Sequence, residues 1–283
     1  MKTPARIEPL VQEGLVDAVI RQLMSGKEAL VYVVRCGEDI RCAKVYKEAN
    51  KRSFRQSVDY TEGRKVKNSR NARAMGKSGR YGRKAREEVW QSAEVDALYR
   101  LAAAGVRVPQ PYDFLEGVLL MELITDANGE AAPRLNDVAL TPEQSREYHQ
   151  TLLSQVVRML CAGVVHGDLS EYNVLVGSEG PVIIDLPQAI DAAGNNNAGR
   201  MLKRDIDNLA AYFGRFAPEL LSTSYGMEIW SLYQGGHLHP DIALTGHFEL
   251  NEKPADVDSV MREIDSALKE EEARKLYKQE MGR

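Results

Sequence analysis

Residues Val164–Leu186 read VVHGDLSEYNVLVGSEGPVIIDL, and the rest of the chain is organised around this stretch. Two runs of β-branched and aliphatic residues, at 174–176 and 182–184, flank the segment GSEGP at 177–181. Strand-forming residues on either side of a short connection rich in turn formers predict a β-hairpin.

Three polar residues stand at the same end of the predicted hairpin. Asp168 and Asn173 precede its first strand, and Asp185 follows its second strand. Converging carboxylate and carboxamide oxygens suit a hard cation such as Mg²⁺, which prefers oxygen ligands. An aspartate five residues before the asparagine can also orient an attacking hydroxyl, as in phosphoryl transfer. The alternative is structural, with Asp168 and Asn173 only capping turns around a buried hairpin.

Length and composition indicate a globular protein. The 283 residues are enough for one large domain or two lobes, and contents of 43% hydrophobic and 28% charged residues are ordinary for this class. The three cysteines are widely spaced, which indicates reduced thiols and excludes a disulfide framework. No apolar run approaches the roughly 18 residues of a membrane span, so we expect a cytoplasmic protein that does not bind membranes.

The charge is unevenly distributed along the chain. Residues 51–86 hold thirteen Lys and Arg but only two acids, a local charge of +11, and the remaining residues carry −15. This segment contains four glycines and few apolar residues, which predicts a long mobile loop. The loop is interpreted either as a clamp for nucleic acid or an acidic partner, or as a solvated insert.

A second hairpin is predicted nearer the N-terminus, from strands at 31–34 and 42–46 around Gly37. It follows a glycine-containing turn, SGKE at 25–28, which can bring backbone amides close to phosphate. The turn lacks the repeated glycines of GxGxxG and does not fit a Walker A loop. Lys44 lies inside the second strand, where it is either a surface lysine or a contact for phosphate oxygens.

Helical spacing of apolar residues begins at Val89 and ends at Gly105, with Glu94 beside the apolar stripe. A buried strand follows at 118–124, and Thr141-Pro142 is a strong helix start. We place the boundary between an N-lobe, residues 1–124, and a C-lobe, residues 125–283, after this strand. The C-lobe ends in a predicted helix at 257–281.

Five segments, taken in order, resemble the RIO family of atypical protein kinases: SGKEALVY at 25–32, CAKVYK at 42–47, VLLMELI at 118–124, HGDLSEYNVL at 166–175 and IID at 183–185. The resemblance implies an α+β, two-lobed, reduced kinase fold, with an antiparallel N-lobe sheet plus one helix and a mainly helical C-lobe. Ser170 agrees with it, because ordinary serine/threonine kinases place a lysine there. Without that charge, Lys44 and metal would supply most of the compensation for the phosphates.

The resemblance also implies catalytic roles. Asp168 would orient or deprotonate the acceptor hydroxyl, while Asn173 and Asp185 would bind Mg²⁺, with Mn²⁺ as an alternative. Lys44 would contact phosphate and pair with Glu94. Some family members are thought to hydrolyse ATP through a phospho-aspartate, which would make Asp185 a nucleophile.

For the nucleotide, the resemblance implies contacts on two sides. Ser25 and Lys27 would approach the phosphates from above. The strand-to-hinge segment, with Met121, Glu122 and Ile124, would hold adenine, and its hydrogen bonds would come from the backbone of Glu122 and Ile124.

The expected function is that of an ATP- and Mg-dependent serine/threonine protein kinase with autophosphorylation or ATPase activity. One alternative is a small-molecule kinase of the aminoglycoside or choline type, which also uses an HGD loop, an Asn and a following Asp. Another is an ATP-gated switch whose basic insert grips RNA or a ribosomal particle.

Overall fold

The computed structural model describes residues 3–26, 28–47 and 93–248. Residues 1–247 form one compact unit, and a second unit begins at Phe248. The predicted basic insert at 51–86 and the predicted helix at 257–281 lie outside the described residues. The division into lobes after residue 124 stays a prediction.

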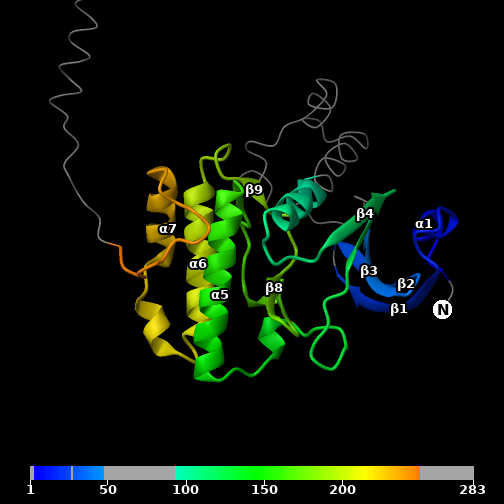
Figure 1. The fold of residues 1–283 in the computed structure, drawn as a ribbon, viewed down its shortest axis with the longest axis horizontal. Helices are drawn as coiled ribbons and strands as arrows, with labels where there is room; N and C mark the ends of the chain where they lie inside the picture. The colour runs from blue at the N-terminus through cyan, green and yellow to red at the C-terminus, as the bar shows by residue number, and fades with distance from the viewer. Residues whose placement is uncertain (1–2, 27, 48–92, 249–283) are drawn as a thin grey trace, which may run out of the picture. The chain divides into compact units, whose positions relative to one another are not determined.

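The N-terminal part is built on a five-stranded antiparallel sheet with the strand order β1-β2-β3-β5-β4 (Figure 1). The pair β2–β3 is the hairpin predicted around Gly37, and Val31 lies opposite Lys44 in its register. A short helix, α1, precedes the sheet. The bounds are α1 Glu8–Gln12, β1 Ala18–Ser25, β2 Ala29–Cys36, β3 Asp39–Tyr46, β4 Pro111–Leu115 and β5 Val118–Glu122.

The two faces of this sheet have different partners because successive side chains of a strand point to opposite faces. Ala43 and Val45 of β3 join a buried cluster with Ile7 and Leu10 from the segment of α1. Tyr46, on the other face, joins the main core of the unit. The same alternation turns Lys44 away from α1, toward the main core.

The helix at 93–103, the unlabelled teal coil beside the sheet in Figure 1, packs against the second face. Val95, Leu98 and Leu101 are buried in the main core at helical spacing. Gly105 follows the last turn with φ +72, and the Val106 amide donates to the Leu101 carbonyl at 3.0 Å. A left-handed glycine of this kind is a common helix stop, so the helix end expected at Gly105 is confirmed.

Up to residue 248, the C-terminal part contains three α-helices, three short 3-10 helices and short strands. Helices α5, α6 and α7 lie side by side (Figure 1), and Thr141 and Gln144 form a capping box at the start of α5. The predicted hairpin is the pair β7–β8. The bounds are η2 Leu135–Asp137, α5 Pro142–Cys161, β6 Val164–Val165, η3 Glu171–Asn173, β7 Val174–Gly177, β8 Gly180–Ile183, β9 Ile190–Asp191, α6 Ala198–Phe213, η4 Pro218–Ser222 and α7 Tyr225–Gln234.

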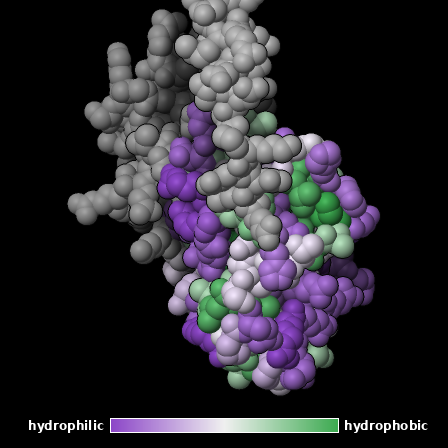
Figure 2. Space-filling model, turned by 90° about the vertical axis from the view of Figure 1, so that its left-hand side faces the viewer, coloured by the Kyte–Doolittle hydropathy of each residue, from purple (hydrophilic) through white to green (hydrophobic). Residues whose placement is uncertain are grey.

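The face shown in Figure 2 carries hydrophobic residues in small, separated groups among hydrophilic ones. Within the described ranges, no helix is both long and apolar enough to cross a membrane.

Candidate active site

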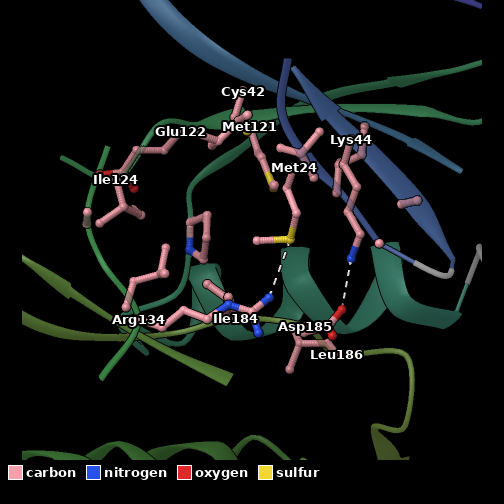
Figure 3. Close-up of a pocket in the computed structure, with 18 of the residues that line it drawn as sticks. Met24, Cys42, Lys44, Met121, Glu122, Ile124, Arg134, Ile184, Asp185 and Leu186 are labelled. Carbon is pink, nitrogen blue, oxygen red and sulfur yellow. Dashed lines mark hydrogen bonds and ion pairs between the residues drawn. The ribbon is translucent and has the colours of Figure 1, made fainter. Parts of the chain in front are cut away.

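A cavity of about 620 Å³ lies between the sheet and the hairpin β7–β8 (Figure 3). Its walls come from β1, β2, β3 and β5, from the helix at 93–103, and from the segments at 131–137 and 184–188. Most of the predicted site residues line it: Lys44, Glu94, Met121, Glu122, Ile124, Asp168 and Asp185. Residues far apart in the sequence therefore share one pocket.

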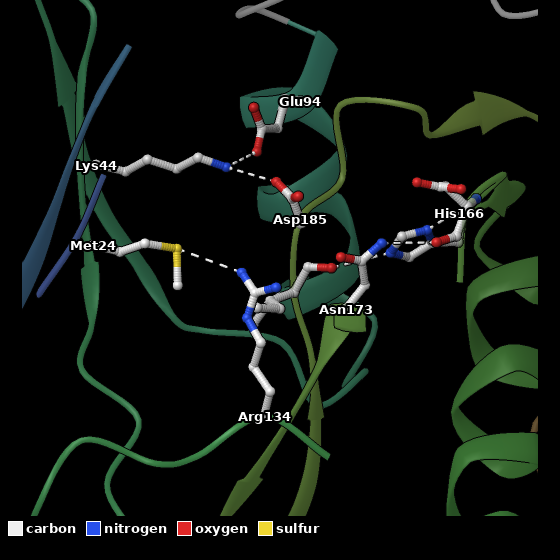
Figure 4. A network of polar contacts seen from close by, with 9 residues as sticks. Met24, Lys44, Glu94, Arg134, His166, Asn173 and Asp185 are labelled. Atoms are coloured by element: carbon white, nitrogen blue, oxygen red, sulfur yellow. Dashed lines mark hydrogen bonds and ion pairs between the residues drawn. The ribbon is translucent and has the colours of Figure 1, made fainter. Parts of the chain in front are cut away.

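Lys44 connects the two sides of the pocket. Its Nζ lies 2.5 Å from Glu94 Oε1 and 3.1 Å from Asp185 Oδ1 (Figure 4). Burial acts to lower the pKa of the Lys44 ammonium, but the two carboxylates outweigh it and raise that pKa well above its ordinary value. Lys44 is therefore charged at any physiological pH, and it is held in an extended position over the pocket.

The loop that carries Asp168 is ordered by the neighbouring histidine. The Asp168 amide donates to His166 Nδ1 at 3.3 Å, while His166 Nε2 lies 3.1 Å from the Ile184 carbonyl. An accepting Nδ1 places the ring proton on Nε2, and burial lowers the pKa of His166, so the ring is neutral. Burial also raises the pKa of the Asp168 carboxyl, and the positive charge of Arg204 opposes this only in part.

Asn173 joins this loop to the far strand of the hairpin. Its side-chain Nδ2 donates to the backbone carbonyl of Asp168 at 2.8 Å, and its backbone carbonyl accepts from the Ile184 amide at 3.0 Å. The next residue, Asp185, has a left-handed backbone with φ +65, which is rare outside glycine and costs energy. Such strain is common at functional sites, and here it accompanies a carboxylate that faces Lys44.

Asp185 lines the cavity, whereas Asn173 is 8% exposed and does not line it; both carry oxygen donors of the type that a hard divalent cation prefers. Because Asn173 Nδ2 is committed to a carbonyl, Oδ1 is the amide atom left to accept or to coordinate. Burial acts to raise the pKa of Asp185, but Lys44 reverses this and keeps the carboxyl ionised. No group of three or more His, Cys, Asp or Glu in the described part of the chain could hold a metal. One carboxylate and one amide are few ligands, so a divalent cation bound by them would take further ligands from substrate phosphates.

The predicted phosphate loop is only partly defined. Ser25 is exposed at the end of β1 and does not line the cavity, whereas its neighbours Met24 and Gly26 do. Lys27 lies outside the described residues. The structure thus brings the turn to the pocket without bringing Ser25 into it.

The predicted hinge lies along one wall of the cavity. The Glu122 amide donates to the Gln110 carbonyl, and the Ile124 carbonyl accepts from the Ala132 amide, each at 2.9 Å. The Glu122 amide and the Ile124 carbonyl are therefore engaged by other parts of the protein. The Glu122 side chain is held by Arg107 through two hydrogen bonds of 2.8 Å, which lower its pKa against the effect of burial.

Sequence reasoning missed Asp205 of α6, which holds the predicted catalytic loop, residues 166–175. Its carboxylate accepts from the amides of Gly167 at 2.7 Å and Leu169 at 3.1 Å, and Asn208 donates to the Leu169 carbonyl at 3.2 Å. Burial raises the pKa of Asp205 to about 7, although the two amides and Arg204 oppose this. A signal was present in the sequence, because Asp205 interrupts the apolar stripe of α6 formed by Met201, Leu202, Ile206 and Leu209.

Comparison with known proteins gives consistent matches. Residues 30–225 match the family model of the RIO domain. RIO-type serine/threonine-protein kinase Rio1 of Haloferax volcanii is 36% identical over 214 residues, which cover 75% of this chain and 69% of the relative. Serine/threonine-protein kinase rio1 of Schizosaccharomyces pombe is 30% identical over 220 residues, and human RIO1 is 27% identical over 219 residues.

The matches to the two eukaryotic relatives cover 75% of this chain but only 41% and 36% of their own lengths. The match to the RIO domain covers more than half of this chain. The match to the Haloferax kinase covers 69% of that relative, so it extends over most of its length. The chain therefore belongs to the RIO family of serine/threonine-protein kinases.

Proposed function

We propose that the protein transfers the γ-phosphate of ATP to a serine or threonine hydroxyl of a protein, and that the residues around Lys44 perform this reaction. The observation that carries the proposal is the contact of 3.1 Å between Lys44 Nζ and Asp185 Oδ1. It joins a cation from the sheet to a carboxylate from the hairpin across a cavity large enough for a nucleotide. Phosphoryl transfer depends on positioning and on charge stabilisation, and both are available here.

In this proposal, Asp168 acts on the acceptor hydroxyl. Its carboxyl lines the cavity, and its raised pKa makes the carboxylate a better proton acceptor than an exposed aspartate. The backbone of its loop is fixed by His166, Asn173 and Asp205, so the carboxylate keeps its direction during the reaction. Preorganisation of this kind removes much of the entropic barrier.

Asn173 and Asp185 would hold the divalent metal, with Mg²⁺ favoured and Mn²⁺ as the alternative. When bound, the metal supplies positive charge to the phosphate oxygens. Lys44 contributes a second positive charge, and Glu94 keeps that ammonium pointed into the pocket. Adenine would lie along the hinge, against Met121, with hydrogen bonds to the Glu122 carbonyl and the Ile124 amide.

The test is Mg-dependent transfer from labelled ATP by the wild type, Asp168→Ala and Asp185→Ala, with a generic protein substrate and a panel of aminoglycosides. We expect label on protein that is lost in both variants. Phosphate release without labelled protein would favour an ATP-driven switch. Transfer to a small molecule would instead favour the aminoglycoside or choline type of kinase.

A phospho-aspartate on Asp185 is a second proposal for the same site, and it rests on the resemblance to the family. The side chain of Asp185 is 45% exposed, which leaves it accessible to a phosphate in the pocket. Hydroxylamine-sensitive label on the protein that is lost in Asp185→Ala would support this step. A label that resists both acid and hydroxylamine would contradict it.

The basic segment at 51–86 supports a further proposal, that the protein also binds RNA or a ribosomal particle in the cytoplasm. Its local charge of +11 favours a polyanionic partner. We expect RNA binding that weakens steeply with salt and disappears when the Lys and Arg of this segment are neutralised. Negligible RNA binding at low salt would remove this partner.

A further inference from the structure

Among the residues that the structure describes, the proposed nucleotide site offers little positive charge that is not already paired. ATP brings a polyphosphate of several negative charges, whereas Lys44 is already paired with Glu94 and Asp185. Ser170 stands in the catalytic loop where ordinary serine/threonine kinases have a lysine. A further cation near the phosphates would make up part of this difference, and the pocket contains one in Arg134.

Arg134 is mounted on a well-anchored segment. Its backbone bridges to Leu175 of β7, and the carbonyl of the preceding Pro133 accepts from the Val176 amide at 2.9 Å. The following residue, Leu135, is fully buried, and its carbonyl accepts from the hydroxyl of Tyr212 at 2.6 Å. The segment has no regular strand, yet these contacts fix the point from which the Arg134 side chain extends.

The guanidinium of Arg134 points across the cavity instead of into solvent (Figures 3 and 4). Its Nη2 lies 3.4 Å from the sulfur of Met24, which comes from β1 on the opposite wall. Within the described part of the chain, no carboxylate lies within ion-pair distance of this guanidinium, and Met24 is the one hydrogen-bond partner of its side chain. A thioether sulfur is a weak acceptor, so most of the bonding capacity of Arg134 is unused.

We propose that Arg134 is a phosphate-binding residue, which turns from Met24 to the phosphate oxygens of a nucleoside di- or triphosphate. This inference rests on the proposed function and assigns a further binding residue to that site. A guanidinium offers a planar fork of donors that matches phosphate geometry. Its field already reaches the metal-binding side of the pocket, where it helps to keep Asp185 ionised.

The contact with Met24 would then be a feature of the nucleotide-free pocket. Met24 lies in β1, directly before the predicted phosphate turn at 25–28. Exchange of the sulfur contact for phosphate oxygens favours the bound arrangement, because a thioether sulfur is a weak, uncharged acceptor whereas a phosphate oxygen carries negative charge. The same exchange would release the Met24 side chain from its contact with Arg134.

The test is titration calorimetry with adenosine, AMP, ADP and ATP, which measures binding and needs no catalysis. The variants are Arg134→Gln, Arg134→Lys and the control Arg146→Gln, in which a remote arginine paired with Glu219 is changed. We expect Arg134→Gln to weaken ADP and ATP binding by about tenfold or more and adenosine binding by less than about twofold. Arg134→Lys should recover part of the loss, and Arg146→Gln should bind like the wild type.

Equal losses for adenosine and ADP in Arg134→Gln would overturn the inference, because the arginine would then only shape the pocket. Unchanged binding of ADP would overturn it as well. Thermal unfolding of each variant shows whether the fold is kept, and Arg134→Lys tests the charge if Arg134→Gln is unstable. Failure of the proposed function would be seen in the phosphotransfer assay instead, where the wild type would bind ATP but transfer no phosphate to protein.

Discussion

The two sides of the pocket hold their charged groups by different means. Lys44 belongs to β3, a strand paired on both edges, with Val31 opposite it in β2 and Leu119 opposite it in β5. Asp168 lies in a loop between short elements, and that loop depends on the side chains of Asp205 and Asn208 from α6. A backbone ladder supports one side, and a few side-chain hydrogen bonds support the other.

This difference decides how each side responds to substitution. A ladder shares its hydrogen bonds among many backbone groups, so no single side chain is needed to keep β3 in place. The catalytic loop concentrates its support on a few buried groups, and removal of one leaves backbone amides without partners. We therefore expect the loop side to be more sensitive than the sheet side to changes of similar size.

The largest effect is expected for Asp205→Asn, which replaces a carboxylate by an amide of the same shape. One of the two accepting oxygens is lost, so the amide of Gly167 or Leu169 loses its partner. A shift of the loop by about 1 Å moves Asp168 away from the acceptor, and we expect kcat to fall by about a hundredfold. Steady-state phosphotransfer measures the change.

The control for this variant is Asp207→Asn, on the same helix. Asp207 is an exposed acid that pairs with Lys203, and its loss should leave kcat within about twofold of the wild type. An Asp205→Asn enzyme with wild-type kcat would show that α6 does not position the catalytic loop.

A smaller effect is expected for Glu94→Gln, the matching change on the sheet side. Lys44 would lose its partner at 2.5 Å but keep Asp185 at 3.1 Å and its place in the ladder. The ammonium would turn toward Asp185, and we expect kcat/KM for ATP to fall by about tenfold. The ratio of the two losses, measured in one assay, tests the comparison directly. A larger loss in Glu94→Gln than in Asp205→Asn would reverse it.

The elements that could be predicted from the sequence are those encoded by local patterns of residues. The hairpin β7–β8, the hairpin β2–β3 and the start of α5 follow from strand and cap signals within a few residues. Asp168, Asn173 and Asp185 were expected together because one hairpin joins them. The Lys44–Glu94 contact spans fifty positions, and it was expected only through the resemblance to a family.

Other contacts depend on packing between distant segments, and no local pattern encodes them. Arg134 lies in a polar stretch without periodicity, and its direction is set by contacts with β7 and with Tyr212 of α6. The role of Asp205 follows from how α6 packs against the loop. Its place in an apolar stripe signals burial, but that place does not say which amides it accepts from.

The smallest effect on activity is expected for substitution of His149, a residue of α5 that packs against α6. Its ring packs against Phe213 of α6 and Tyr225 of α7, with ring centroids 5.6 and 5.7 Å away. His149 is 2% exposed, and its Nε2 has no hydrogen-bond partner within the described residues. Burial lowers the pKa of His149 from 6.5 to about 4, so the ring is neutral in the folded protein at neutral pH.

This pKa fixes the sign of an acid sensitivity. The unfolded chain binds the proton at about pH 6.5 and the folded chain only near pH 4, so the free energy of unfolding decreases as the pH falls between these values. The contribution of His149 to this loss reaches roughly 3 kcal/mol. His149→Phe keeps an aromatic ring against its neighbours and removes the titration. We therefore expect kcat near neutral pH to stay close to that of the wild type and the acid sensitivity to shrink.

Urea unfolding of both proteins at pH 7 and pH 4.5 separates His149 from the other groups. The raised pKa of Asp205 has the opposite effect on the free energy of unfolding, because it stabilises the folded protein in acid. Asp205 is present in both the wild type and His149→Phe. The difference between the two proteins in the free energy of unfolding lost between pH 7 and pH 4.5 therefore reports His149 alone. If both lose the same free energy of unfolding in acid, the ring of His149 is not held neutral against α6 and α7. If His149→Phe instead lowers kcat as strongly as Asp205→Asn, the loop side depends on the packing behind α6 as much as on its hydrogen bonds.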